Sequence, residues 1–83
     1  EQESALKIYP NPTEGGITIE VLEKTFGGTN TIEIRSISGQ LALVDNLSGL
    51  KKQIDISHLS KGIYFVTVRN TSKVETVKLV LRP

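Results

Sequence analysis

The chain has 83 residues, a net charge of +1 and no cysteine. This length suits one small domain, the lack of cysteine excludes disulfides and cysteine-based zinc sites, and the near-neutral charge gives no support for nucleic-acid binding. No run approaches the ~20 apolar residues of a membrane-spanning helix, and no apolar secretory segment opens the chain. We therefore expect one small domain with no membrane anchor, nucleic-acid partner or cofactor.

Charge is distributed unevenly along the chain. Residues 1–33 contain six glutamates and two lysines, whereas residues 34–83 contain eight lysines or arginines and three acidic residues. Ordinary solvated strand faces would account for this difference. The alternative is a basic C-terminal half that meets an acidic partner surface.

Residues 1–4 have no pattern and are interpreted as the remnant of a linker, so the domain is expected to cover residues 5–83. From there on, apolar residues alternate with polar ones, as at Ile17, Ile19 and Val21. Such alternation indicates strands with one buried and one solvent-facing side, and no window has the apolar stripe of a long helix. The predicted strands are residues 5–9, 16–22, 31–37, 40–45, 51–56, 62–70 and 73–82.

Residues typical of turns separate these strands. A loop rich in proline and glycine covers residues 11–16, and polar loops are expected at 27–30, 46–49 and 70–72. Ser38-Gly39 fits a two-residue hairpin loop. Strands at this spacing predict an all-β, Ig-like, seven-stranded antiparallel β-sandwich.

Residues 57–61 differ from the other connections. Ser57 can cap a single helical turn there, with Leu59 pointing inward and Gly62 ending it. The strand that follows has apolar residues on both faces, which predicts the most central strand of the domain. Tyr64 in that strand is expected to be buried, with its hydroxyl reaching a backbone acceptor.

Catalytic and metal-binding patterns are not found. His58 is the only histidine, and its spacing from Asp55 gives no reason for the two to form a catalytic pair. One histidine without cysteine does not suit zinc, and the loops are too poor in carboxylates to indicate a calcium site, although the sequence leaves a structural calcium open. The glycine pairs precede no helix, so they do not predict a phosphate site. We expect no catalytic, cofactor-binding or metal-binding residues and no enzyme activity.

Carbohydrate binding is considered because many small bacterial β-sandwiches bind glycans. Such sites require exposed aromatic rings, on which the faces of sugars stack. The chain has four aromatic residues, and at least one of the pair Tyr64 and Phe65 must belong to the core. Tyr9 and Phe26 are scattered and make a weak platform. The alternative function is therefore a non-catalytic binding or adhesion module of a surface enzyme, directed at glycan or protein.

Three segments in a fixed order carry a family resemblance. They are Tyr9-Pro10-Asn11-Pro12, then Ser38-Gly39-Gln40, then the spaced set Asp55, Ser57, Leu59, Gly62 and Tyr64, followed by a final strand with Lys78. Together they resemble the type A C-terminal sorting domains of the type IX secretion system (Por secretion system), from Leu6 to Arg82. The ending Leu81-Arg82-Pro83 departs from the lysine-rich ends of many similar domains.

The resemblance implies a β-sandwich that acts as a C-terminal secretion signal behind N-terminal cargo domains of the same chain. It implies transit through the periplasm, recognition by the outer-membrane type IX translocon, and removal by a sortase-like cysteine peptidase, with cleavage in the linker before residue 5. The cargo would then reach the outer membrane, the cell surface or the medium. Such a signal is expected at the extreme C-terminus of the full protein, and an internal location would contradict the hypothesis.

We expect the receptor to read the end of the domain that contains Gly62 together with the final strand. This region combines a tight turn with a basic edge strand, whose free backbone groups suit strand addition. Edge strands would also support a weak homodimer. Most motif residues are expected to hold the fold. The candidate translocon-contacting residues are Pro10, Asn11, Pro12, Gly62, Tyr64, Lys78 and Arg82.

Overall fold

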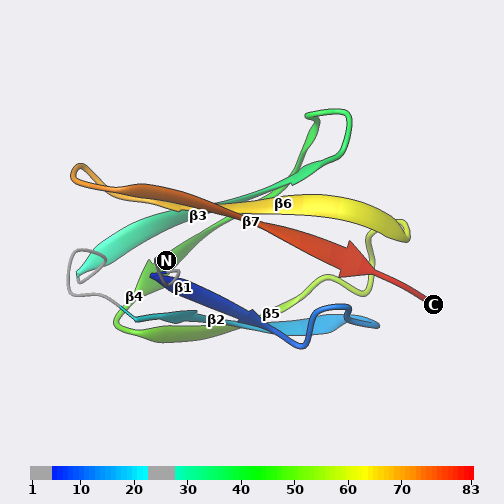
Figure 1. Ribbon diagram of the computed structural model, residues 1–83, viewed down its shortest axis with the longest axis horizontal. Coiled ribbons are helices and arrows are strands. Elements are labelled where there is room, and N and C mark those ends of the chain that lie inside the picture. Colours follow the sequence, from blue (N-terminus) through cyan, green and yellow to red (C-terminus); the bar gives the residue numbers. More distant parts are fainter. Residues whose placement is uncertain (1–4, 23–27) are drawn as a thin grey trace, which may run out of the picture.

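The computed structural model describes residues 5–22 and 28–83. Two β-sheets pack face to face as separate layers (Figure 1). Three features discussed above lie outside the described residues: the predicted linker remnant (residues 1–4), Phe26, and Gly27 of the predicted 27–30 loop. None of the described residues belongs to a helix that is long and apolar enough to cross a membrane.

The smaller sheet has three strands in the order β1-β2-β5 and the larger has four in the order β4-β3-β6-β7. All strand pairs within the two sheets are antiparallel. The seven-stranded Ig-like sandwich is therefore confirmed. The strands are β1 (Leu6–Tyr9), β2 (Gly16–Val21), β3 (Thr29–Ser36), β4 (Leu41–Ser48), β5 (Lys51–Asp55), β6 (Gly62–Arg69) and β7 (Val74–Leu81).

The core fills the space between the sheets with alternate residues of each strand, as the period of two predicts. Burying a branched aliphatic side chain of this kind stabilises a fold by about 1.5–3 kcal/mol. β6 lies between β3 and β7 and is therefore an inner strand as expected, but β3, between β4 and β6, is equally central. The fully buried aliphatic residues are Ile19, Ile32, Ile34, Leu47, Ile56, Val66, Val68, Leu79 and Leu81.

Two strands extend further than predicted, β3 at its start and β4 at its end. β3 begins at Thr29 and β4 continues to Ser48, whereas the sequence suggested loops at 27–30 and 46–49. Asn30 pairs with Leu47 in the ladder, and both residues are buried. Ladder pairing and burial thus outweigh the turn preference of asparagine and serine.

The β3–β4 hairpin has a three-residue loop, so the prediction of a two-residue Ser38-Gly39 loop was wrong. The Ser36 N–H donates to the Gln40 carbonyl at 2.8 Å, and the Gly39 N–H donates back to the Ser36 carbonyl at 2.9 Å. Gly39 has φ = 93°, in the left-handed region. A turn followed by a left-handed glycine is a common three-residue hairpin.

The predicted helical turn at 57–61 is instead a β-turn. The Leu59 N–H donates to the Ile56 carbonyl at 3.0 Å. The Asp55 carboxylate accepts the Ser57 N–H at 2.9 Å, so Asp55, and not Ser57, supplies the capping oxygen. Leu59 packs against the core as expected. Gly62 starts β6 at φ = 152° and does not end a helix.

Candidate functional site

The loop between β1 and β2, residues 10–15, lies against the outer edge of β7; it is called the proline loop below. The Asn11 side-chain amide donates from Nδ2 to the Lys78 carbonyl at 2.7 Å. Its Oδ1 accepts the Val80 N–H at 3.1 Å. One side chain therefore satisfies two backbone groups of the edge strand, as a peptide unit of a neighbouring strand would.

Thr13 continues this pairing with its own backbone. Its N–H donates to the Val80 carbonyl and its carbonyl accepts the Arg82 N–H, both at 2.9 Å, in a parallel bridge opposite Leu81. Thr13 is only 2% exposed. Its hydroxyl donates to the Gly16 carbonyl at 2.7 Å and shapes the loop. The loop thus acts as a short extra strand beside the end of β7.

The turn at 55–62 contacts the same loop. The Ile56 N–H donates to the Gly15 carbonyl at 2.7 Å, and Ile56 is fully buried. Hydrogen bonds from the Ser57 N–H and hydroxyl, with a smaller contribution from the charge of His58, lower the pKa of the exposed Asp55 carboxylate below its ordinary value. The carboxylate therefore stays ionised while it holds the turn.

All three sequence motifs meet at one end of the sandwich. A depression lined by residues of the β3–β4 hairpin also includes His58, Leu59 and Ser60 of the 55–62 turn. The proline loop and the end of β7 lie at the same end, on the right in Figure 1. Motifs that are up to 55 residues apart in sequence, from Tyr9 to Tyr64, therefore lie at the same end of the sandwich.

The structure brings most of the predicted recognition residues together here. Pro10, Pro12 and Arg82 line one shallow depression with Thr13 to Gly16. Asn11 contacts the backbone of Lys78, and Gly62 pairs with Leu81, next to Arg82. The exposed prolines have no N–H to add to the edge.

Tyr64 lies at the base of this surface, where it lines the depression between the β3–β4 hairpin and the 55–62 turn. It is 6% exposed, and its hydroxyl donates to the Ser60 carbonyl at 2.5 Å, so the expectation of a buried tyrosine with a backbone acceptor is confirmed. Sequence reasoning did not select Thr13, which makes both backbone–backbone hydrogen bonds between the proline loop and the end of β7. Its polar side chain next to Pro12, before a strand, would have been the available signal.

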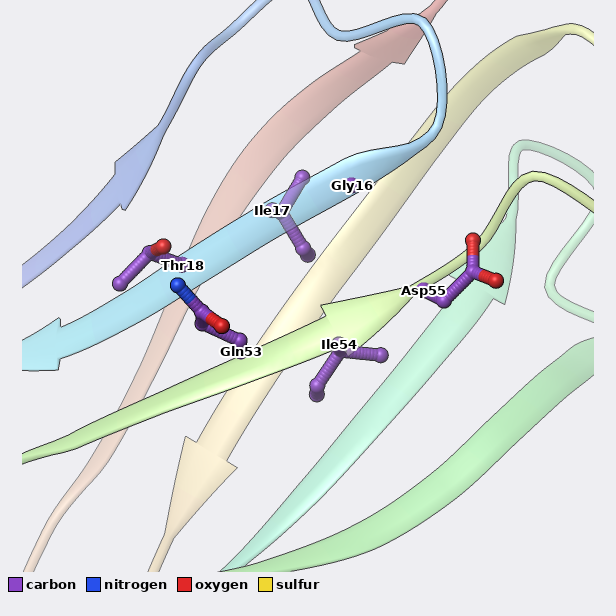
Figure 2. Close-up of a pocket in the computed structure, with 6 residues that line it drawn as sticks. All are labelled: Gly16, Ile17, Thr18, Gln53, Ile54 and Asp55. Atoms are coloured by element: carbon purple, nitrogen blue, oxygen red, sulfur yellow. The ribbon is translucent and has the colours of Figure 1, made fainter.

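A third depression lies over β2 and β5 of the smaller sheet, seen in Figure 2 with the larger sheet behind it. Thr18 and Gln53 are opposite each other in the ladder, and the Asp55 side chain stands apart at the end of β5 (Figure 2). The lining residues, from Gly16 to Thr18 and Gln53 to Asp55, include no aromatic ring.

Three aromatic residues lie in the described ranges, and they do not form one stacking platform. The Tyr9 hydroxyl donates to Glu20 Oε1 at 2.9 Å, and the Lys7 ammonium lies 5.3 Å from the centre of the Tyr9 ring. Tyr64 is buried, and Phe65 is 36% exposed on the outer face of the larger sheet. Within residues 5–22 and 28–83, no three histidine, cysteine or acidic side chains gather as metal ligands would.

Comparison with known families decides what this arrangement belongs to. Residues 7–82 match the family described as the secretion system C-terminal sorting domain. The chain belongs to this family. It is therefore a type IX secretion sorting signal of an exported cargo protein, as the resemblance in the sequence indicated.

The sorting domain has no match among curated proteins. Its family consists in general of non-catalytic signal domains that form part of a larger cargo chain and interact with the type IX secretion system. Membership implies export of the cargo to the outer membrane, the cell surface or the medium.

Proposed function

We propose that the outer-membrane type IX translocon recognises the sorting domain through the end that carries the proline loop, Gly62 and Arg82. The observation that supports this proposal is the pairing of the proline loop with β7. Asn11 and Thr13 bond to four backbone groups of residues 78–82. Recognition of this composite end requires that the first loop and the last strand are both in place, so it reports a fully folded domain.

Exposed side chains at this end are the direct contacts in the proposal. Pro10, Pro12 and Arg82 line the depression described above, and Lys78 is exposed on β7 beside Phe65. Asn11 and Gly62 contribute by holding the loop and the strand start in position. Tyr64 contributes through the buried support of the 55–62 turn.

The rest of the export route is part of the same proposal. The domain passes through the periplasm behind N-terminal cargo domains and catalyses no reaction itself. A sortase-like cysteine peptidase removes it by cleavage before residue 5, so residues 1–4 are the remaining linker and residues 5–83 the signal.

Export of a fluorescent reporter tests the proposal. The reporter carries a Sec signal in front and residues 1–83 behind, in a host with a working type IX system and in a strain that lacks the translocon. We expect reporter on the surface or in the medium of the first strain and in the periplasm of the second. Periplasmic retention in both strains, with the domain shown to be folded, would instead favour the binding module.

Side-chain variants of the same fusion test the recognition end. We expect Lys78→Ala and Arg82→Ala to reduce export while the thermal unfolding temperature stays unchanged. Lys51→Ala is the matched control, because Lys51 is an exposed lysine at the start of β5 in the other sheet. Export at the wild-type level in both test variants would count against the proposed contacts.

A further inference from the structure

The outer edge of β7 is only half covered. The proline loop bonds to the Lys78 carbonyl, to both backbone groups of Val80 and to the Arg82 N–H. In an antiparallel strand, alternate residues direct their backbone groups to opposite sides. Both backbone groups of Val80 are directed at the proline loop. The backbone groups of Val74 and Thr76 and the N–H of Lys78 are therefore directed to the same edge of β7, beyond the end of the loop.

Within the described part of the chain, nothing pairs with this second half of the edge. β7 is the last strand of its sheet, and no backbone hydrogen bond joins Val74 or Thr76 to another segment outside the β6–β7 ladder. That ladder runs without a bulge from Gly62–Leu81 to Arg69–Val74. Val74–Lys78 is therefore a regular, extended stretch in which the outward backbone groups of Val74 and Thr76 and the N–H of Lys78 have no backbone partner among the described residues.

The other edge strands are less suited to strand addition. β1 has four residues and β5 has five. β4 has eight residues, as β7 has, but its pairing with β3 is interrupted by an irregularity at Ile34/Arg35. Short strands and bulges protect an edge from pairing with other chains. An edge lysine such as Lys78 opposes pairing with basic or apolar segments, so it limits the partners of β7 to acidic ones. β7 has eight residues. The proline loop already pairs with one half of its outer edge, so this edge accepts a strand-like partner.

Side chains along this edge define the chemistry of a partner. On the outer face, Val74, Thr76 and Lys78 are exposed. The neighbouring strand adds Arg69, whose carboxylate partner Glu33 is shared with Arg35. The outer side of an added strand would therefore meet an excess of positive charge.

On the inner face the charge requirement is reversed. Glu75 pairs with the buried Val68 and Val77 with the buried Val66, so both face the inner side. An added strand with an acidic residue on this side would place like charges next to Glu75. Apolar residues suit this side, because Val77 packs against the core.

We propose that Val74–Lys78 binds an extended segment of a partner protein by strand addition, with acidic side chains on the outer face beside Lys78 and apolar side chains on the inner face beside Val77. The inference rests on the proposed function in one respect: the partner is a component of the machinery that receives the domain. The bound partner segment would lie next to the proline loop, and the two together would cover the whole outer edge of β7.

A second copy of this chain fits the edge less well. Antiparallel self-pairing centred on Thr76 would use the outward groups of Val74, Thr76 and Lys78, but it would also bring the two Glu75 side chains diagonally opposite each other on the inner face. Diagonal neighbours are about 7–8 Å apart, within reach of long side chains, so the two carboxylates oppose this pairing. The homodimer through edge strands is therefore an outcome that the test must distinguish.

Binding is measured first on residues 1–83 with two peptide probes. One five-residue peptide alternates valine with glutamate, and the control alternates valine with lysine. We expect the acidic peptide to slow amide exchange at Thr76 and Lys78 by about tenfold, the effect of about one hydrogen bond of net stability. The Val77 amide, which faces β6, is the internal control. Unchanged exchange, or equal protection by the basic peptide, would overturn the proposal.

Variants at Thr76 then test the same edge in the export assay. Thr76→Pro removes an outward N–H that the β6–β7 ladder does not use, so proline is tolerated there. Thr76→Glu and Thr76→Lys form a matched pair, since both lose the 2.9 Å contact between the Thr67 and Thr76 hydroxyls. We expect the proline and glutamate variants to reduce export about tenfold and the lysine variant to retain it.

Failure of this inference differs from failure of the sorting function. Wild-type export by a folded Thr76→Pro domain overturns strand addition, while translocon-dependent export of the unaltered domain still upholds the signal. If the unaltered domain is exported without the translocon, the sorting function fails and the peptide measurement alone decides the edge. Self-association in sedimentation that Thr76→Pro abolishes would replace the proposed partner by a second copy.

Discussion

Thr13 lies opposite Leu81 in a parallel bridge that joins the first loop of the chain to its last strand. The first loop follows a strand of the smaller sheet, whereas β7 is an edge strand of the larger sheet. The bridge therefore links the two layers by backbone hydrogen bonds at the end where the family motifs meet. Loss of either side of this contact should loosen the final strand.

Asn11→Ala should destabilise the domain, because it removes both side-chain hydrogen bonds to Lys78 and Val80. Hydrogen bonds of this kind contribute about 0.5–1.5 kcal/mol each, so we expect a loss of about 1–3 kcal/mol in the free energy of unfolding in urea. Asn46→Ala on the exposed part of β4 is the control. Equal losses in the two variants would contradict a special role of Asn11, as would unchanged amide exchange at Val80.

Thr13→Val keeps the shape of a buried side chain and removes its hydroxyl. The carbonyl of Gly16 and the N–H of Gly15 then lose their partner, which should cost about 1–3 kcal/mol. Thr13→Ser retains the hydroxyl and should recover most of this loss. A stable valine variant would show that packing, and not the hydroxyl, holds the proline loop.

Gly62→Ala should lower the unfolding temperature through its backbone alone. Gly62 has φ = 152°, and an added Cβ would meet nothing within 4 Å, so the effect comes from a conformation that other residues rarely adopt, at a cost of about 1–3 kcal/mol. Gly16→Ala is the matched control, because its Cβ would also meet nothing within 4 Å and its φ is not positive. Similar unfolding temperatures for both variants would contradict this explanation.

Stability should decrease at low pH through two carboxyl groups. The pKa of Asp55 is lowered by hydrogen bonds from Ser57, and that of Asp45 by the Asn46 N–H and then by Lys52. A carboxylate with a lowered pKa in the folded state stabilises the fold above its unfolded pKa, and this contribution disappears as the pH falls through the folded pKa.

The fold should therefore lose stability below pH values near 3.8, the ordinary pKa of both groups. The measurement is the free energy of unfolding in urea at pH 5 and at pH 2.5. We expect a smaller decrease for the Asp45→Asn, Asp55→Asn double variant than for the unaltered domain. An identical decrease in both proteins would assign the acid sensitivity to other groups.

Tyr64→Phe separates support of the fold from recognition. The variant loses the hydrogen bond to the Ser60 carbonyl and should be destabilised by about 1–2 kcal/mol. Because Tyr64 is buried, export of the reporter at a temperature where the variant is folded should equal the wild-type level. Reduced export of a fully folded variant would place the hydroxyl in the recognition process itself.

Local patterns were enough to predict much of this domain. Alternating apolar residues gave all seven strands, and apolar residues on both faces of residues 62–70 predicted that β6 is an inner strand, although its outer face is not covered by another layer and Phe65 there is exposed. Turn chemistry was less dependable. Ser38-Gly39 and Ser57 suggested connections that differ from the observed ones, since the final geometry depends on which carbonyls and carboxylates lie within reach.

The sequence by itself determined the fold class, the core and the family, because periodicity and turn residues act over a few positions. Tertiary structure alone decided that Asn11 pairs with Val80, 69 residues away, and that the proline loop covers only the end of β7. Which half of an edge is covered depends on how two twisted sheets stack and where a loop then comes to rest. No local sequence pattern predicts how far the proline loop extends along the edge of β7.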